Sequence, residues 1–502
     1  MKKIFIILVS ILVITSCEDD LNQAPLSEVG SNGFYKNADD IKVALNGVYE
    51  RLDAYPVRAF YMSEIRSDNV WGVSQGGVRP WDPINNFSTN LPTSDVIRDA
   101  WNINYNAIMG TNAILDAMQD ESLVGDDAAL RARLIAEARF MRAFSYFDLV
   151  RYFGGVPLIT TLVTPEASLE ISRSPVTDVY TVILEDLQFA IDNLDETYTG
   201  IDVGRPTKDA ARAYKALVHL TRSGPTYGIK GPGLAVNEYS DALTLLNAII
   251  SGGRHATESV YADIFSYNNE LNDGNTEIIF DIQYIGGGLG LGGQWPGEFV
   301  PESFPRTTGG AVSGGLDVKR ISLDFIANMD TANDVRWLAS VQQGWTDLTG
   351  TFRDDLFYNK WIDFSRYPTD RFEYELNYPL MRYTDVLMLK AEAILQGASG
   401  TQAEVDLIIN DVRTRAGIPT ITNATLDDLI AERRREFMGE GLRWHTLVRT
   451  GKVIDVMNAW LRPAEPGSDV MPTEMNANFI IYPLNQAQID IKPGLYEQNP
   501  GY

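Results

Sequence analysis

Apolar residues recur every three or four positions through most of the chain, which is the spacing of amphipathic helices. In residues 38–54 this pattern follows Asn37, a residue suited to cap a helix N-terminus. In residues 174–194 it follows Ser174, a potential cap, and Pro175, which suits the first helical position. The same periodicity predicts further helices over 95–119, 126–152, 207–223, 237–251, 380–396, 402–416 and 425–438.

Helices of this length joined by short turns predict a stacked array of helix hairpins, as in tetratricopeptide repeats. The signature residues of that repeat do not recur at a fixed period. The last predicted helix opens with Thr425 and Asp428 in the spacing of a capping box.

Two segments depart from the helical pattern. Residues 55–93 contain four prolines and two tryptophans, and residues 284–318 contain 11 of the 41 glycines. Between 277 and 284 apolar side chains alternate with others, which predicts a half-buried strand. Long loops that contain tryptophan are more often functional than disordered.

The N-terminus predicts export and lipid attachment. Lys2 and Lys3 precede an apolar run of eleven residues, which is too short to cross a bilayer. Ile14-Thr-Ser-Cys17 resembles the lipobox of bacterial lipoproteins, and Cys17 is the only cysteine. We therefore expect residues 1–16 to be a signal peptide, Cys17 to be the lipid attachment site, and 17–31 to be the anchor and tether. The alternative is an ordinary signal peptide with a chance cysteine.

The chain is strongly acidic, with a formal net charge of −25, and loss of residues 1–16 would remove two lysines and leave −27. Such a surface repels nucleic acid. Glu18-Asp-Asp20 resembles the tag that sends some bacterial lipoproteins to the outer face of the outer membrane. In other bacteria an acidic residue at this place means retention at the inner membrane.

Signals for catalysis are weak. The three histidines do not have metal-ligand spacing, and Gly288 to Gly293 matches a nucleotide-binding pattern without a helix to follow it. Sixty-seven acidic residues supply some pair of carboxylates in any fold, so glycosidase geometry cannot be inferred from them. No cofactor is expected, although a structural calcium ion around 272–274 stays open. In residues 432–437, Glu432 and Arg435 stand three positions apart, a spacing that pairs charges on a helix, and this favours a solvated helix face over an anion site.

Several motifs occur in one order along the chain and resemble those of the SusD/RagB family of outer-membrane nutrient-binding lipoproteins. They are Tyr35-Lys-Asn-Ala-Asp-Asp40, Ala44-Leu-Asn-Gly-Val-Tyr49, Ser63-Glu-Ile-Arg-Ser-Asp68, Glu137-Ala-Arg-Phe-Met-Arg142, Phe153-Gly-Gly-Val-Pro157, Arg382-Tyr-Thr-Asp385 through Glu392, Arg413-Thr-Arg415, Glu432 through Trp444, and Gln498 through Tyr502. The chain departs from the family at Tyr482-Pro-Leu-Asn485, where Pro-Ile-Pro is more usual.

The resemblance implies a mostly α fold. Tetratricopeptide-like hairpins would form a scaffold, and a more irregular, loop-rich second half would contain short strands. It places a helical region at 32–255 and a C-terminal region at 256–502. It also implies a non-enzymatic, lipid-anchored protein on the outer surface of the outer membrane. Such a protein acts as the lid of a SusC-like TonB-dependent transporter and delivers an oligosaccharide to it.

The resemblance does not transfer ligand residues, so these are predicted from the loops. Sugar rings stack on aromatic planes, and their hydroxyl groups bind amides and carboxylates. The candidates are Trp71, Trp81, Tyr284 and Trp295 for stacking, and Asn69, Gln75 and Asp82 for hydrogen bonds. The alternative is that these aromatic residues are ordinary core. The alternative functions are peptide binding, as in some members of the family, and surface glycoside hydrolysis.

Overall fold

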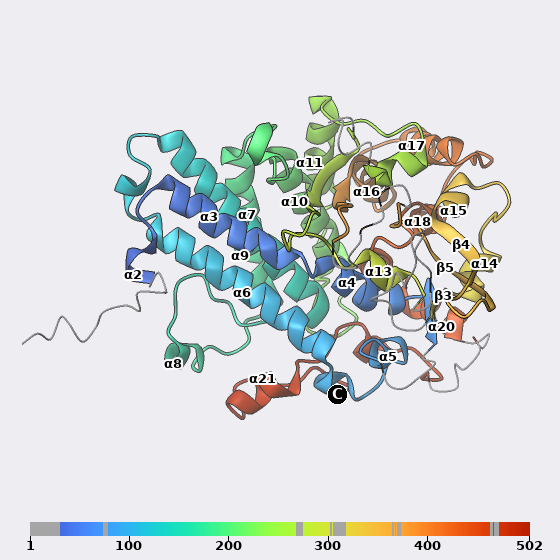
Figure 1. Cartoon of the computed structure of the whole chain (residues 1–502), viewed down its shortest axis with the longest axis horizontal. Helices are drawn as coiled ribbons and strands as arrows, with labels where there is room; N and C mark the ends of the chain where they lie inside the picture. Colours follow the sequence, from blue (N-terminus) through green and yellow to red (C-terminus); the bar gives the residue numbers. More distant parts are fainter. Residues whose placement is uncertain are drawn as a thin grey trace, which may run out of the picture.

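The computed structural model describes residues 31–73, 79–267, 275–301, 304, 318–363, 366, 368, 373–461, 465 and 471–502. The predicted signal peptide, Cys17 and the tether, Gln75 and the calcium candidate at 272–274 lie outside them. Over the described residues the molecule is mostly helical, and its strands pair in three two-stranded sheets (Figure 1). The prediction of a mostly α fold is confirmed.

Four helix hairpins follow one another in the part of the chain that the structure describes. They are α3 (Ala38–Tyr49) with α6 (Asp95–Ala117), α7 (Ala128–Phe153) with α9 (Val176–Asn193), α10 (Lys208–Ser223) with α11 (Tyr239–Gly252), and α16 (Tyr383–Leu395) with α17 (Gln402–Arg415). Each hairpin packs against the next, so the array runs from α3 to α17 (Figure 1). None of the helices in these described segments is both long and apolar enough to cross a bilayer.

Shorter helices complete the fold. They are α2 (Ser31–Phe34), α4 (Tyr55–Ala59), α5 (Asp82–Asn85), α8 (Pro165–Ser168), α13 (Pro296–Phe299), α14 (Leu323–Ala327), α15 (Val335–Ser340), α18 (Leu426–Glu436), α19 (Arg443–Arg449), α20 (Val453–Leu461) and α21 (Gln486–Ile491). The turn α13 directly follows the glycine-rich loop, where the sequence analysis expected no helix; at four residues it is too short to offer an anion site.

Side-chain caps fix where several helices begin. The Asn37 side chain accepts hydrogen bonds from the backbone N–H groups of Asp39 and Asp40, as predicted. Thr425 and Asp428 form the predicted capping box of α18. Helix α9 begins at Val176, one residue later than predicted. Pro175 rather than Ser174 precedes its first residue, and no side chain caps this end.

Helix α7 is buried on all sides from Phe140 to Phe153, and both α6 and α9 pack against it. Its charged side chains are therefore paired. Arg142 Nε lies 2.8 Å from Asp186 Oδ2, and Glu137 Oε2 lies 2.7 Å from Arg205 Nη1. These charged motif residues serve the scaffold.

The segment 55–93 is more regular than the sequence analysis predicted. Helix α4 runs directly into a π-helical turn over Phe60–Ile65, so residues 55–65 are helical throughout. Pro56 lies in the first turn, where the missing N–H costs nothing. The π-helical turn is buried on every side, and a helix buried all round carries no amphipathic period.

All three strand pairs are antiparallel. Strand β1 (Val70–Val73) pairs with β3 (Val318–Ile321), β2 (Ile278–Ile282) with β6 (Tyr378–Arg382), and β4 (Val341–Thr346) with β5 (Phe352–Tyr358). The predicted strand at 277–284 is confirmed over Ile278–Ile282. Tyr284 follows its end and donates its backbone N–H to the Asn377 side chain.

Residues 480–502 form a strap across the N-terminal helices. Tyr482 donates its N–H to the Tyr152 carbonyl at 2.7 Å, and its hydroxyl donates to the Met62 carbonyl at 2.9 Å. The Asn499 amide donates to the carbonyls of Phe153 and Tyr482. The C-terminal end of the chain is therefore fixed to α7 and to the π-helical turn.

Candidate functional site

A large group of charged side chains is buried in the second half of the chain. Helix α18 carries it: Glu432 and Glu436 are fully buried, and Arg433 and Arg434 nearly so. The prediction of a solvated helix face is wrong here, although the predicted pair Glu432–Arg435 does form, at 3.2 Å. The helix is enclosed because α16, α17 and α19 all pack against it.

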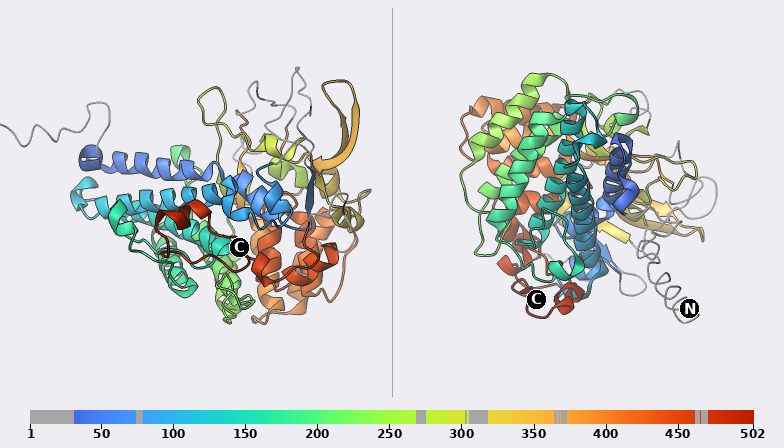
Figure 2. Two further views of the ribbon diagram at one scale, coloured as in Figure 1. Left: turned by 90° about the horizontal axis from the view of Figure 1, so that it is seen from below. Right: turned by 90° about the vertical axis from the view of Figure 1, so that its left-hand side faces the viewer.

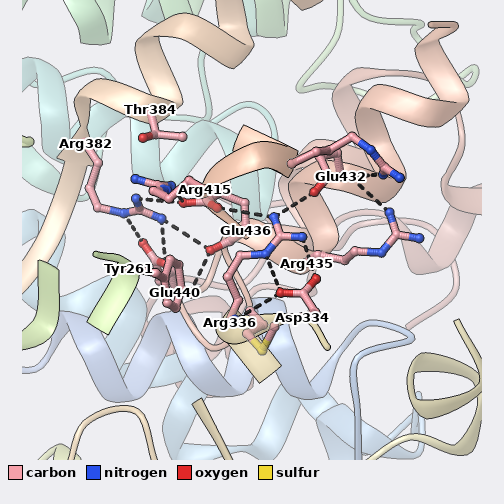
Figure 3. Close-up of polar contacts among 12 residues, drawn as sticks. Tyr261, Asp334, Arg336, Arg382, Thr384, Arg415, Glu432, Arg435, Glu436 and Glu440 are labelled. Carbon is pink, nitrogen blue, oxygen red and sulfur yellow. Dashed lines mark hydrogen bonds and ion pairs between the residues drawn. The ribbon is translucent and has the colours of Figure 1, made fainter. Parts of the chain in front are cut away.

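Arginines from neighbouring elements converge on these carboxylates (Figure 3). Arg336 of α15 lies 2.7 Å from Glu432 and 3.3 Å from Glu436. Arg382, at the end of β6, lies 3.1 Å from Glu436 and 2.8 Å from Glu440. All of these groups are buried and paired with one another, so the cluster is a structural cross-link rather than a catalytic cleft.

The binding role of the ligand candidates stays a prediction, and five of the six that the structure describes are buried. The rings of Trp71, Trp81 and Trp295 are covered, with exposures of 3%, 0% and 0%. Trp81 packs against Gly72, where a Cβ atom would collide with the indole. Trp295 contacts the rings of Trp361 and Tyr378 at 5.0 and 5.1 Å between centroids. Burial therefore favours packing for the three indoles.

Of the other candidates, Asn69 is also buried and engaged. Its amide donates to Glu64 at 2.7 Å, and its oxygen accepts from Arg434 at 2.9 Å. Tyr284 is also buried, with 6% exposure, but it lines a surface hollow, and Asp82 lines a different one. The structure thus does not bring the six candidates together at one site.

Tyr284 lies in a hollow of about 430 Å³, which we call the β2 hollow. It is formed by the end of α3, the segment 201–205, β2 with the residues after it, and the glycine-rich loop. Its lining residues are Asn46, Tyr49, Glu50, Leu52, Asp53, Ile201, Val203, Gly204, Arg205, Phe280, Asp281, Ile282, Gln283, Tyr284, Ile285, Gly290, Leu291 and Gly292. The volume and the mixture of apolar walls with a few polar groups are typical of small-molecule sites.

The glycine-rich loop that borders the β2 hollow has a defined conformation. Ile285 donates its N–H to the Leu291 carbonyl at 3.0 Å, which closes the loop on itself. Gly287, Gly288 and Gly290 all have positive φ, which other residues adopt only with strain. The glycines are therefore explained by the turn, and the turn holds Leu291 at the rim.

Carboxylates dominate the electrostatics of the β2 hollow. Burial raises the pKa of Asp281 to about 6, although hydrogen bonds from Gln283 and Asn377 oppose the shift. Burial and then the neighbouring Glu50 also raise the pKa of Asp53. Arg205, the one cation among the lining residues, is held by Glu137 and Asp202 at 2.7 and 2.8 Å. The hollow thus suits a neutral, hydroxyl-rich ligand better than an anion.

Among the lining residues that were not predicted as candidates are Asp281, Gln283 and Asn46. Asp281 falls between the alternating apolar residues of β2. A polar residue at this place in a half-buried strand was the one sign in the sequence that it could face a ligand. Asn46 lies on a helix more than 230 residues away, and nothing in a single sequence joins the two.

Asp82 lies in a wider hollow of about 900 Å³ beside α5, which includes residues 79–95 and 471–479. One oxygen of Asp82 accepts a hydrogen bond from the Arg79 backbone at 2.7 Å. Asp82 thereby also helps to hold the turn that precedes α5. Among the described residues, no three His, Cys, Asp or Glu side chains gather as a metal ion would require.

A family model described as "SusD family" matches residues 348–502, and one described as "Starch-binding associating with outer membrane" matches 46–220. The SusD-like protein P38 of Formosa agariphila is 26% identical over 90% of this chain and 92% of its own length.

Solved structures share the fold. Surface glycan-binding protein A from Bacteroides fluxus aligns with a TM-score of 0.78 at 22% identity, over 92% of this chain and 99% of that one. Surface glycan-binding protein A from Bacteroides thetaiotaomicron, solved in complex with laminarihexaose, aligns with a TM-score of 0.76 at 22% identity, over 92% and 100%. The order of the motifs, the four hairpins and the two family models agree, and this chain belongs to the SusD/RagB family.

Proposed function

We propose that this protein is a cell-surface lipoprotein that binds an oligosaccharide and passes it to a TonB-dependent outer-membrane transporter, for which it acts as the lid. The observation that carries the proposal is the shared fold, over 92% of the chain, with a surface glycan-binding protein that holds laminarihexaose. The division into regions 32–255 and 256–502, the lipid on Cys17 and the surface location belong to the same proposal.

The β2 hollow is the ligand site in this proposal. The half-buried Tyr49 provides apolar surface, while the exposed Asn46 and Gln283 present amides to hydroxyl groups. The protein needs no catalytic group for this task, because capture and release are binding steps.

Replacing Gln283 or Asn46 by Ala should weaken binding of a neutral hexasaccharide by about 1 kcal/mol each, or roughly fivefold, through loss of one hydrogen bond. Laminarihexaose is the first ligand to test, within a panel of hexasaccharides of different linkage, by calorimetry. Gln119→Ala, which removes an exposed amide on another part of the surface, is the control. Unchanged affinity in both variants would place the ligand elsewhere.

A glycoside hydrolase is the second candidate, because Asp281 shares the β2 hollow with Glu50 and Asp53. Burial raises the pKa of Asp281 to about 6, and a carboxyl group with a raised pKa that shares a cleft with a second carboxyl group is the arrangement such enzymes use. Chromatography of the hexasaccharides after incubation with the protein distinguishes the two functions. Shortened products that disappear with the variant Asp281→Asn would establish hydrolysis, whereas intact glycan supports a binding protein. Displacement of the glycan by peptides would instead favour the peptide-binding alternative.

Exposed apolar residues at the rim of the β2 hollow favour contact with a protein partner. Four of the residues that line it, Ile201, Val203, Ile285 and Leu291, are strongly exposed, and Leu289 lies beside them in the same loop; Ile201 is 98% exposed. An exposed apolar patch around a polar hollow is typical of an interaction surface.

Mild detergent extraction should recover the wild type together with a large outer-membrane β-barrel. The double variant Ile201→Asp/Leu291→Asp should lose most of that partner, since two buried charges would be left unpaired at the contact. Leu407→Asp, an equally exposed site on α17, should keep it. Cys17→Ala tests anchoring separately by shifting the protein out of the membrane fraction. Retention of the β-barrel by the double variant would contradict this contact.

A further inference from the structure

The β4–β5 hairpin extends away from the body of the molecule, on the side where α3 lies (Figure 2, left). Its turn is fixed locally. Asp347 accepts hydrogen bonds from the N–H groups of Thr349 and Thr351 at 2.9 and 3.0 Å, and from Arg353 Nε at 2.9 Å. These hydrogen bonds therefore hold the tip of the hairpin in shape.

Phe352 occupies the first position of β5 and is 63% exposed. Of the aromatic side chains that the structure describes, it alone is more than half exposed. Its ring leans over Gly344, where a Cβ atom would collide with ring carbons, and Gly344 has φ of +70° at a bulge of β4. Two independent reasons therefore require glycine at position 344: the positive φ of its backbone and the Phe352 ring above it.

Polar groups flank the exposed ring. Side chains on one face of a strand alternate, so Phe352 and Asp354 point to the same face of β5. Gln343 on β4 donates its amide to Asp354 Oδ1 at 3.0 Å, which places it on that face too. Thr346 lies opposite Phe352 in the register. An exposed ring thus lies beside a carboxylate, an amide and a hydroxyl group.

We propose that this face of the hairpin is a second sugar-binding site, separate from the β2 hollow, in which one sugar ring stacks on Phe352 and its hydroxyl groups bind Asp354 and Gln343. This inference rests on the proposed glycan-binding function. A saccharide fits better than a protein partner, because one phenyl ring within polar groups matches the apolar face and the polar edge of a single sugar ring. A protein interface would need a much larger contiguous surface.

The site is tested by calorimetry of the full chain with the same panel of neutral hexasaccharides, including laminarihexaose. Phe352→Ala should lower the affinity for the bound glycan about tenfold, as loss of aromatic stacking does. Phe352→Tyr and Phe352→Trp should restore it, and Asp354→Asn should weaken it less. The melting temperature should stay unchanged in all four, since the ring is exposed. Leu348→Ala, which removes an exposed apolar side chain at the same tip, is the matched control and should bind as the wild type does.

Equal affinity of Phe352→Ala and the wild type would overturn the site. So would loss of the β-barrel partner with glycan affinity intact, which would make Phe352 a protein contact. If the wild type itself bound no glycan in the panel, the proposed function would be overturned. This outcome differs from failure of the hairpin site alone, in which the wild type binds glycan and Phe352→Ala binds it equally well.

Discussion

Glu436→Gln should lower the free energy of unfolding by about 3–5 kcal/mol, the cost of breaking a buried ion pair from one side. Glu436 is fully buried and meets Arg382 and Arg336 at 3.1 and 3.3 Å, with Arg415 also in contact. Removal of its charge leaves these three arginines with less compensation in a site that excludes water. Denaturant unfolding measures the loss. Glu170→Gln, which breaks the exposed pair with Lys492, should change stability by less than about 1 kcal/mol.

The same carboxylate predicts how stability responds to acid. Burial alone would raise the pKa of Glu436, but Arg415, Arg382 and Arg336 outweigh it and lower the pKa to about 2. Because the unfolded pKa is near 4.5, the stabilisation is complete above that pH and is lost as the pH falls toward 2. Glu436→Gln should flatten this part of the stability curve between about pH 4.5 and 2, whereas an unchanged curve would show that Glu436 is not held ionised.

Trp81→Ala should cost about 3–5 kcal/mol of stability while glycan affinity, measured below the melting temperature, stays that of the wild type. The indole is fully buried and packs directly on Gly72, so truncation leaves a cavity that the strand backbone cannot fill. Trp81→Phe should recover part of the loss. If Trp81→Ala instead kept its melting temperature and lost affinity, the ring would stack on the ligand as the sequence first suggested.

The helical array was predictable because its helices are amphipathic and capped. Asn37 and the pair Thr425 and Asp428 mark helix starts that the structure reproduces. Prediction failed where elements are enclosed on every side. Residues 55–65 have no polar face to set a period, and 432–436 are charged yet buried because their partners arrive from three other elements. A single sequence shows charges but not the arginines that meet them.

The candidate site was less predictable than the fold. Tryptophans on proline-rich segments were reasonable ligand planes, but Trp71, Trp81 and Trp295 pin those segments to the interior. The β2 hollow joins Asn46, Gly204 and Asp281, which local patterns cannot bring together. Phe352 gave no signal at all, since an aromatic residue in a strand is usually half-buried.

The strap formed by residues 480–502 has a consequence for the order in which the chain folds. The hydrogen bond from Tyr482 to Met62 joins positions 420 residues apart, and the bond from Asn499 to Phe153 joins positions 346 apart. Contacts this distant form only after a long loop has closed, which makes folding slow. During synthesis the first two hairpins leave the ribosome long before residue 482. The Tyr152 and Phe153 carbonyls therefore lack their native hydrogen-bond donors until the end of the chain has been made. The native state is therefore reached only after synthesis, and the interval before the strap closes is when apolar surfaces of the early hairpins stand open to aggregation and to chaperones.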